Sequence, residues 1–182
     1  MLQRIIDLKE INDDSIFLWG PRQTGKSTLL KQLFPTVPYY DLLKSDVYSR
    51  YKLKPSLFRD ECMMLDENAV VIVDEVHWLM SNRGLRFILC GSSARKLKRS
   101  GANLLGGRAI RKVLHPLVSA EIPDFDLEKA INHGMLPRHY LMDNPQKRLQ
   151  AYIGDYLQQE IIAEALVRNL DSFTRFLEVA AL

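Results

Sequence analysis

The sequence has little cysteine, little histidine and no long apolar run. Its two cysteines, Cys62 and Cys90, have no paired or metal-type spacing, so we expect neither a disulfide framework nor a cysteine metal site. The four histidines show no H-x-x-x-H or H-E-x-x-H spacing, which makes a histidine metal site improbable. The N-terminal residues lack the apolar stretch of a signal peptide, and no run approaches the roughly 20 apolar residues that span a bilayer. We therefore expect a cytoplasmic protein without a membrane segment.

The composition is otherwise that of an ordinary soluble domain. Hydrophobic residues make up 47% of the 182 residues and charged residues 26%, which excludes a disordered or fibrous chain. The length suits one domain with room for the start of a second. The net charge of +3 is mild and falls short of the strongly basic surface of dedicated nucleic-acid binders.

The apolar pattern predicts strands that alternate with helices. Unbroken apolar runs such as 69–73 and 86–90 are typical of strands buried on both faces of a parallel sheet. The other predicted strands are 15–19, 37–42 and 109–114, and helices are predicted after residue 26 and, in two pieces divided by Pro55, within 43–68. The sequence thus predicts an α/β fold with a mostly parallel five-stranded sheet and helices on both faces. Ligands are expected at the carboxyl ends of the strands.

The sequence changes in character after Pro123. Apolar residues recur at helical spacing from 146 to 169, and a second helix is predicted from about 172 to the last residue. We therefore expect a first domain over residues 1–122. Residues 123–182 are expected to form a small helical segment, either a lid or the lead into a winged helix, that is incomplete.

The clearest motif is a phosphate-binding loop. Residues 20–27 read G-P-R-Q-T-G-K-S, which matches the P-loop pattern G-x-x-x-x-G-K-[ST] between a predicted strand and a predicted helix. Backbone N–H groups of such a loop wrap around phosphates at a helix N-terminus. Lys26 would reach the β- and γ-phosphates, and the Ser27 hydroxyl would bind Mg²⁺. The predicted nucleotide-binding residues are Gly20, Pro21, Arg22, Gln23, Thr24, Gly25, Lys26, Ser27 and Thr28. We expect a P-loop NTPase fold that binds ATP and Mg²⁺.

Polar residues follow two of the predicted buried strands. Asp74 and Glu75 come directly after 69–73, where an aspartate can hold Mg²⁺ and a glutamate can deprotonate the attacking water. A carboxylate pair that caps the next helix is the alternative. Ser92 or Ser93 could contact the γ-phosphate as the sensor of ATPases that insert an extra strand between the P-loop strand and the acidic strand. The same serines could equally cap the following helix.

With these elements in view, the chain resembles a family of AAA-type ATPases of bacteria and archaea. Its members carry a P-loop domain, a winged-helix region and a C-terminal, nuclease-like domain of unknown function. The resemblance rests on G-P-R-Q-T-G-K-S-T-L-L, V-D-E-V, R-F-I-L-C-G-S-S-A-R-K-L-K-R, A-N-L-L-G-G-R-A, H-P-L, G-M-L-P, Y-L-Q-Q-E-I and F-T-R-F-L-E-V-A-A, in this order. It implies that Asp74 is the Mg²⁺ carboxylate, Glu75 the catalytic base and the serine after the fourth strand the sensor.

The resemblance also implies an arginine that acts on the γ-phosphate. Arg108 in L-G-G-R is the candidate catalytic arginine, with Arg22 and Arg111 as alternatives. The alternative to a catalytic role is that Arg108 is a solvated arginine or pairs with Glu121. The sequence departs from the family in one segment, because only V-H-W-L-M-S-N-R-G-L separates Glu75 from the fourth strand. A second departure is expected, the absence of the family's C-terminal domain. The first is interpreted as a short deletion that would alter packing over the carboxylates.

These observations predict an ATPase that couples hydrolysis of ATP, to ADP and phosphate, to a conformational change in attached or partner domains. The alternative is a nucleotide-dependent binding module with little or no turnover of ATP. One form of this hypothesis is that the module associates with DNA. Residues 94–99 with Arg108, Arg111 and Lys112 form a basic stretch that could contact nucleic acid, although a solvated helix face is commoner. A protein partner, the absent domain or a further copy of the chain are the other expected partners.

Overall fold

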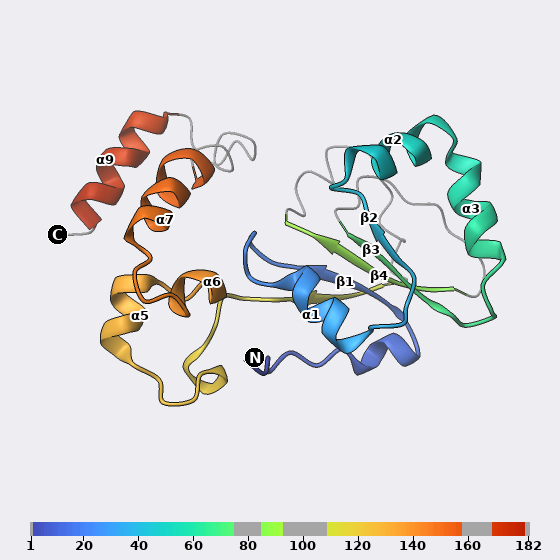
Figure 1. Ribbon diagram of the computed structural model, residues 1–182, viewed down its shortest axis with the longest axis horizontal. Helices are drawn as coiled ribbons and strands as arrows, with labels where there is room; N and C mark the ends of the chain where they lie inside the picture. Colours follow the sequence, from blue (N-terminus) through green and yellow to red (C-terminus); the bar gives the residue numbers. More distant parts are fainter. Residues whose placement is uncertain (1, 75–84, 93–108, 158–168, 181–182) are drawn as a thin grey trace. The chain divides into compact units, whose positions relative to one another are not determined.

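The computed structural model describes residues 2–74, 85–92, 109–157 and 169–180 (Figure 1). The chain divides into two compact units, Met1–Phe125 and Asp126–Leu182. The first unit is an α/β structure, and the described part of the second is helical. Among the described residues, no helix is both long enough and apolar enough to cross a membrane.

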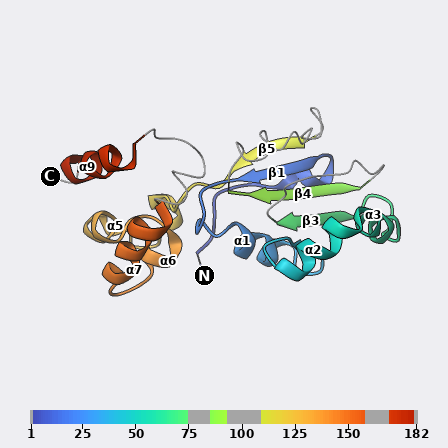
Figure 2. The same cartoon turned by 90° about the horizontal axis from the view of Figure 1, so that it is seen from above.

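The first unit is built around a five-stranded sheet in which every pair of neighbouring strands is parallel. The strands are β1 (Ser15–Trp19), β2 (Tyr39–Asp41), β3 (Val70–Asp74), β4 (Arg86–Gly91) and β5 (Ala109–Val113). Their order in the sheet is β2-β3-β4-β1-β5, and Figure 2 shows the last four side by side. The predicted α/β fold is confirmed. Strand β4 lies between the strand that precedes the P-loop and the strand that ends on Asp74.

Alternating side chains of the buried strands face opposite sides of the sheet, and helices cover both sides. Helix α1 (Lys26–Leu33) and the 3₁₀ helix η1 (Lys9–Asn12) contribute to one core. Helices α2 (Ser45–Leu53) and α3 (Pro55–Met63) contribute to the other. The α1-side core includes Ile16, Leu18, Leu29, Leu30, Ile72 and Ile88, and the α2/α3-side core includes Phe17, Trp19, Tyr51, Phe58, Val71 and Phe87.

Strand β2 is shorter than predicted. It spans Tyr39–Asp41 where the apolar pattern suggested 37–42. Pro38 has no N–H to donate to a ladder, so it takes part through its carbonyl alone, which accepts a hydrogen bond of 2.9 Å from Ile72 N–H. After β5 the chain forms a 3₁₀ turn, η3 (Ser119–Glu121), that brings Glu121 into the interior.

The second unit consists of short helices. Those described are α5 (Leu127–His133), α6 (Pro137–Tyr140), α7 (Gln146–Ala151), the π-helical turn η4 (Tyr152–Leu157) and α9 (Leu170–Ala180). Asp126 caps α5 by accepting a hydrogen bond of 3.0 Å from Lys129 N–H. The helix predicted from residue 146 begins there and becomes π-helical at Tyr152, and residues 158–168 lie outside the described part. The last helix begins at Leu170, two residues before the predicted start at 172. The interpretation of residues 123–182 as a lid or as the lead into a winged helix stays a prediction.

Candidate functional site

The phosphate loop joins the end of β1 to the start of α1, and its backbone depends on glycine. Gly20 has φ +153° and Gly25 has φ +89°, a region that other residues rarely adopt. A Cβ atom on Gly20 would lie 2.1 Å from the carbonyl oxygen of Leu114, just after β5. Leu114 N–H in turn donates a 2.7 Å hydrogen bond to Trp19 O. The loop can therefore leave β1 against the end of the neighbouring strand only because residue 20 has no side chain.

Lys26 lies inside the curve of this loop. Its side chain is buried, and Nζ donates hydrogen bonds of 2.7 Å to Gly20 O and 2.8 Å to Pro21 O. The Thr24 hydroxyl, also buried, donates to Pro21 O at 2.9 Å. The loop thus holds a cation at its centre by contacts to its own carbonyl groups, in the position that the P-loop pattern predicts for a phosphate-binding lysine.

The first turn of α1 is suited to an anion. Gly25 is its N-cap residue and has no side chain with which to satisfy the first N–H groups of the helix. A Cβ atom built on Gly25 would meet nothing within 4 Å, so the space beside it is open. A helix N-terminus carries a partial positive charge, and an open N-terminus next to a buried lysine favours a phosphate group.

The structure brings the two predicted Mg²⁺ ligands together. Asp74 is the last residue of β3 and faces the same side of the sheet as Ile72, the side that α1 covers. Ser27, in the first turn of α1, donates a hydrogen bond of 2.5 Å from Oγ to Asp74 Oδ2. A serine hydroxyl and a carboxylate are the hard oxygen ligands that Mg²⁺ prefers, so these residues fit a magnesium site beside the phosphate loop.

A third residue at this point, Tyr39, was not predicted from the sequence. Its hydroxyl also donates to Asp74 Oδ2. Burial, and then the hydrogen bond to Asp74, raise the pKa of the Tyr39 phenol far above its ordinary value, so the hydroxyl keeps its proton and acts as a donor. The segment P-Y-Y-D shows two adjacent tyrosines, and the alternation of a strand puts only one of them on the α1 side. Nothing in the sequence distinguished which one.

A buried ion pair ties the loop to the two ends of the first unit. Arg4 donates from Nη1 to Thr24 O at 2.8 Å and from Nη2 to His115 O at 2.7 Å. Its Nε lies 3.0 Å from Glu121 Oε1, and both side chains are less than a tenth exposed. Geometrically the Nε contact is an ion pair and not a hydrogen bond. Among the described residues, Glu121 therefore pairs with Arg4, which the sequence had not indicated. Arg108 lies outside the described residues, so its alternative role as a partner of Glu121 stays a prediction.

Glu121 is held by several donors at once. Burial by itself would raise the pKa of this carboxyl group. Hydrogen bonds from Ile5 N–H at 2.8 Å, from Val118 N–H at 3.2 Å and the contact with Arg4 outweigh that effect. The pKa of Glu121 is therefore lowered from its ordinary value, and the carboxylate is the favoured form in the folded chain.

Several predicted site residues lie outside the described residues. Glu75, Ser93, Arg108 and the basic run 94–99 belong to this group, and their roles stay predictions. Ser92 is described and follows Gly91 at the end of β4, half-buried. The alternative arginines, Arg22 in the loop and Arg111 on the edge strand β5, are both exposed.

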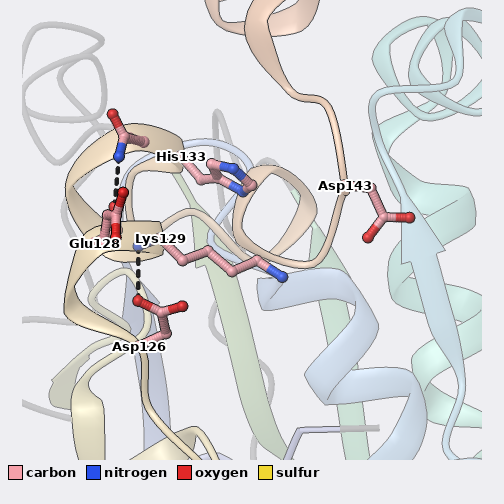
Figure 3. Close-up of a pocket in the computed structure, with 6 residues that line it drawn as sticks. Asp126, Glu128, Lys129, His133 and Asp143 are labelled. Atoms are coloured by element: carbon pink, nitrogen blue, oxygen red, sulfur yellow. Dashed lines mark hydrogen bonds between the residues drawn. The ribbon is translucent and has the colours of Figure 1, made fainter.

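The second unit has a hollow of its own, shown in Figure 3. It measures about 350 Å³ and is lined by Asp126, Glu128, Lys129, Asn132, His133 and Asp143. Asp126 caps helix α5, and Asn132 Nδ2 donates to Glu128 O at 2.9 Å. Among the described residues, no group of three histidine, cysteine or acidic side chains is placed to bind a metal. The hollow is lined by polar residues of α5, its N-cap Asp126 and Asp143 after α6, and we assign it no role in the nucleotide site.

The comparison with protein families concerns the first unit. A family model described as an AAA domain matches residues 12–123. The matched range contains the phosphate loop, Asp74 and all five strands of the sheet. No curated protein matches the chain.

Proposed function

We propose that this chain, which belongs to the AAA domain family of nucleotide-binding P-loop proteins, binds ATP with Mg²⁺ and hydrolyses the ATP to ADP and phosphate. The observation that carries the proposal is the contact between the first turn of α1 and the end of β3, next to the phosphate loop. The Ser27 hydroxyl meets the Asp74 carboxylate at 2.5 Å, directly after the buried Lys26 in the loop. The first turn of α1 thus supplies both a cation for the phosphates, Lys26, and one oxygen ligand for a metal, Ser27, and β3 supplies the second oxygen ligand, Asp74.

The residues of the loop have distinct tasks in this proposal. The Lys26 ammonium is already removed from water and held by Gly20 O and Pro21 O, so a phosphate oxygen would take the place of carbonyl partners and not of bulk water. Backbone N–H groups after Gly25 would donate to the other phosphate oxygens. The positive charge of Mg²⁺ would offset the negative charge of the phosphates. Ser27 and Asp74 would hold that ion.

Hydrolysis itself is assigned to residues next to this group. Glu75 follows Asp74 at the carboxyl end of β3 and would orient and deprotonate the attacking water. Ser92 follows β4, the strand between β1 and β3, so it starts from the same edge of the sheet and would contact the γ-phosphate. Arg108 would stabilise the charge that develops on the transferred phosphoryl group. We further propose that turnover changes the conformation of the helical unit or of a partner domain.

The experiment compares nucleotide binding with phosphate release. Wild-type protein should release phosphate from ATP only with Mg²⁺. The Glu75→Gln variant should keep its affinity for ATP and lose about 100-fold or more in release, because a general base contributes on that order. Lys26→Ala should lose binding. The matched control is Lys52→Ala, an exposed lysine on α2, which should behave as wild type.

Two results would contradict the proposal in different ways. Normal ATP binding by Lys26→Ala would refute the site itself. Binding by the wild type without any release of phosphate would instead favour the alternative, a nucleotide-dependent binding module. For that alternative the basic run 94–99 suggests DNA as a partner, and retention on duplex DNA that falls steeply with salt would support it.

A further inference from the structure

We propose that Tyr39 is a positioning residue of the nucleotide site, whose hydroxyl orients the Asp74 carboxylate toward Ser27 so that the two can hold Mg²⁺. The inference rests on the proposed function, because it deepens the role of the same site. It starts from one observation. A single oxygen, Asp74 Oδ2, accepts hydrogen bonds from two hydroxyl groups that belong to different elements, Ser27 on α1 and Tyr39 on β2.

Strand register explains how Tyr39 reaches the carboxylate. Tyr39 is paired with Ile72, and Ile72 lies two residues before Asp74 on the same face of β3. Two residues of a strand rise about 6.6 Å, which is close to the length of a tyrosine side chain. The phenol hydroxyl can therefore reach Asp74 from the position paired with Ile72. The pairing of an edge strand thus determines where this donor is.

Helix α1 also contacts the ring of Tyr39. Lys31 Nζ lies 4.8 Å from the centroid of the ring, and Lys31 is one turn after Ser27 on the same helix. Tyr39 also packs against the α1-side core. The ring contacts α1 and the core, whereas the hydroxyl donates to Asp74 and lies beside the Ser27 side chain. A change to phenylalanine would therefore remove the donor and leave the ring contacts.

The two donors to Asp74 are not equivalent. Ser27 is itself a proposed metal ligand and adjoins the phosphate loop, so its contacts change when the loop takes up a nucleotide. Tyr39 comes from β2, outside the phosphate loop. Donors of this kind, which bind a ligand residue and not the metal, orient that residue, and their loss commonly costs 10- to 100-fold in metal affinity.

The neighbouring residue supplies a matched control. Tyr40 is paired with Val73 and packs on the opposite side of the sheet. Its ring makes edge-to-face contacts with Tyr51, at 5.7 Å between centroids, and with Phe58, at 4.9 Å. Tyr40→Phe also removes a tyrosine hydroxyl from β2, but on the face of the sheet opposite to Asp74.

The experiment measures the affinity for a fluorescent ATP analogue with saturating Mg²⁺ and with EDTA. The ratio of the two dissociation constants is the gain from Mg²⁺. We expect Tyr39→Phe to reduce this gain about 10-fold, with an unchanged dissociation constant in EDTA, while Tyr40→Phe keeps the wild-type gain. In an Asp74→Asn background, Tyr39→Phe should have no further effect, because its action passes through that carboxylate.

Each contrary result has its own meaning. A wild-type gain in Tyr39→Phe overturns the positioning role and leaves the proposed function standing. Tyr39→Phe could instead weaken binding equally in Mg²⁺ and in EDTA, or keep its effect in the Asp74→Asn background. Either result would show that Tyr39 only supports the fold, and would also overturn the positioning role. Wild-type protein that binds no ATP analogue with Mg²⁺ overturns the proposed function, and this inference with it. If Tyr39→Phe does not fold, Tyr39→Met, which has no hydroxyl or N–H donor in its side chain, replaces it in the same comparison.

Discussion

Single glycines decide whether the phosphate loop can form. Gly20→Ala should lower the free energy of unfolding by about 3 kcal/mol or more, because the new Cβ would lie 2.1 Å from Leu114 O in a backbone region that strains other residues. Urea denaturation of the two proteins measures the difference. The comparison is Gly25→Ala, where φ is also positive but the Cβ would meet no atom, so strain alone should cost about 1–2 kcal/mol. Equal losses would show that the approach to Leu114 is unimportant.

The two cysteines are packing residues of the core. Cys62 and Cys90 are both about 1% exposed, as expected of small apolar side chains in a core. Burial, with a smaller effect of the Glu61 charge, raises the pKa of the Cys62 thiol to about 11, so the reactive thiolate is disfavoured at neutral pH.

At the scale of elements, Glu61 joins helices α2 and α3. Its carboxylate accepts hydrogen bonds of 2.6 Å from Arg50 and 2.6 Å from Tyr51, and the Tyr51 ring is buried in the α2/α3-side core. Glu61→Ala should destabilise the first unit by about 1–3 kcal/mol, mainly because the Tyr51 hydroxyl loses its acceptor. Thermal or urea unfolding measures this loss.

The contribution of Tyr51 can be separated from that of Arg50. In a Tyr51→Phe background the cost of Glu61→Ala should shrink to that of the half-exposed contact with Arg50, which is worth about 1 kcal/mol or less. An undiminished cost in that background would mean that the tyrosine hydroxyl is not what Glu61 stabilises.

At the scale of the first unit, the Arg4–Glu121 pair joins the N-terminal segment, the phosphate loop and the chain after β5. Arg4→Ala should cost about 3–5 kcal/mol in unfolding free energy, because it leaves a buried carboxylate without its cation and frees Thr24 O. The control is Lys9→Ala, which breaks an exposed pair with Asp7 and should change stability little. Similar losses in both variants would contradict the special role of the buried pair.

The same pair predicts an acid dependence. The pKa of Glu121 is lowered in the folded state, so its contribution is complete above about pH 4.5, the ordinary value, and is lost as the pH falls through the lower folded pKa. Glu121→Gln should therefore unfold with a weaker pH dependence below pH 4.5 than wild type. Glu67→Gln, at an exposed position, should keep the wild-type dependence. Parallel acid limbs for wild type and Glu121→Gln would contradict this prediction.

The sequence determined the features that depend on neighbours along the chain. Apolar runs predicted β1 at its observed bounds and β3 and β4 to within one residue at each end, since burial on two faces requires apolar side chains throughout. The edge strand β5 was predicted to within one residue as well, although its sequence includes Arg111 and Lys112. The phosphate loop was predicted because its residues are contiguous, and phosphate binding requires small residues and a lysine at fixed spacing. The roles of Glu75 and Arg108 and the relation to larger family members stay predictions from the sequence.

Tertiary structure alone decided which distant side chains meet. The order β2-β3-β4-β1-β5 puts Tyr39 beside Ile72, and only this register makes Tyr39, and not Tyr40, the donor to Asp74. Arg4 meets Glu121 because the N-terminal segment packs along the chain after β5. The same packing lets Ile5 N–H donate to Glu121, although these two residues are 116 positions apart in the sequence. Local patterns specify strands, helices and contiguous motifs. Partners of buried polar groups depend on register and packing, which no spacing in the sequence expresses.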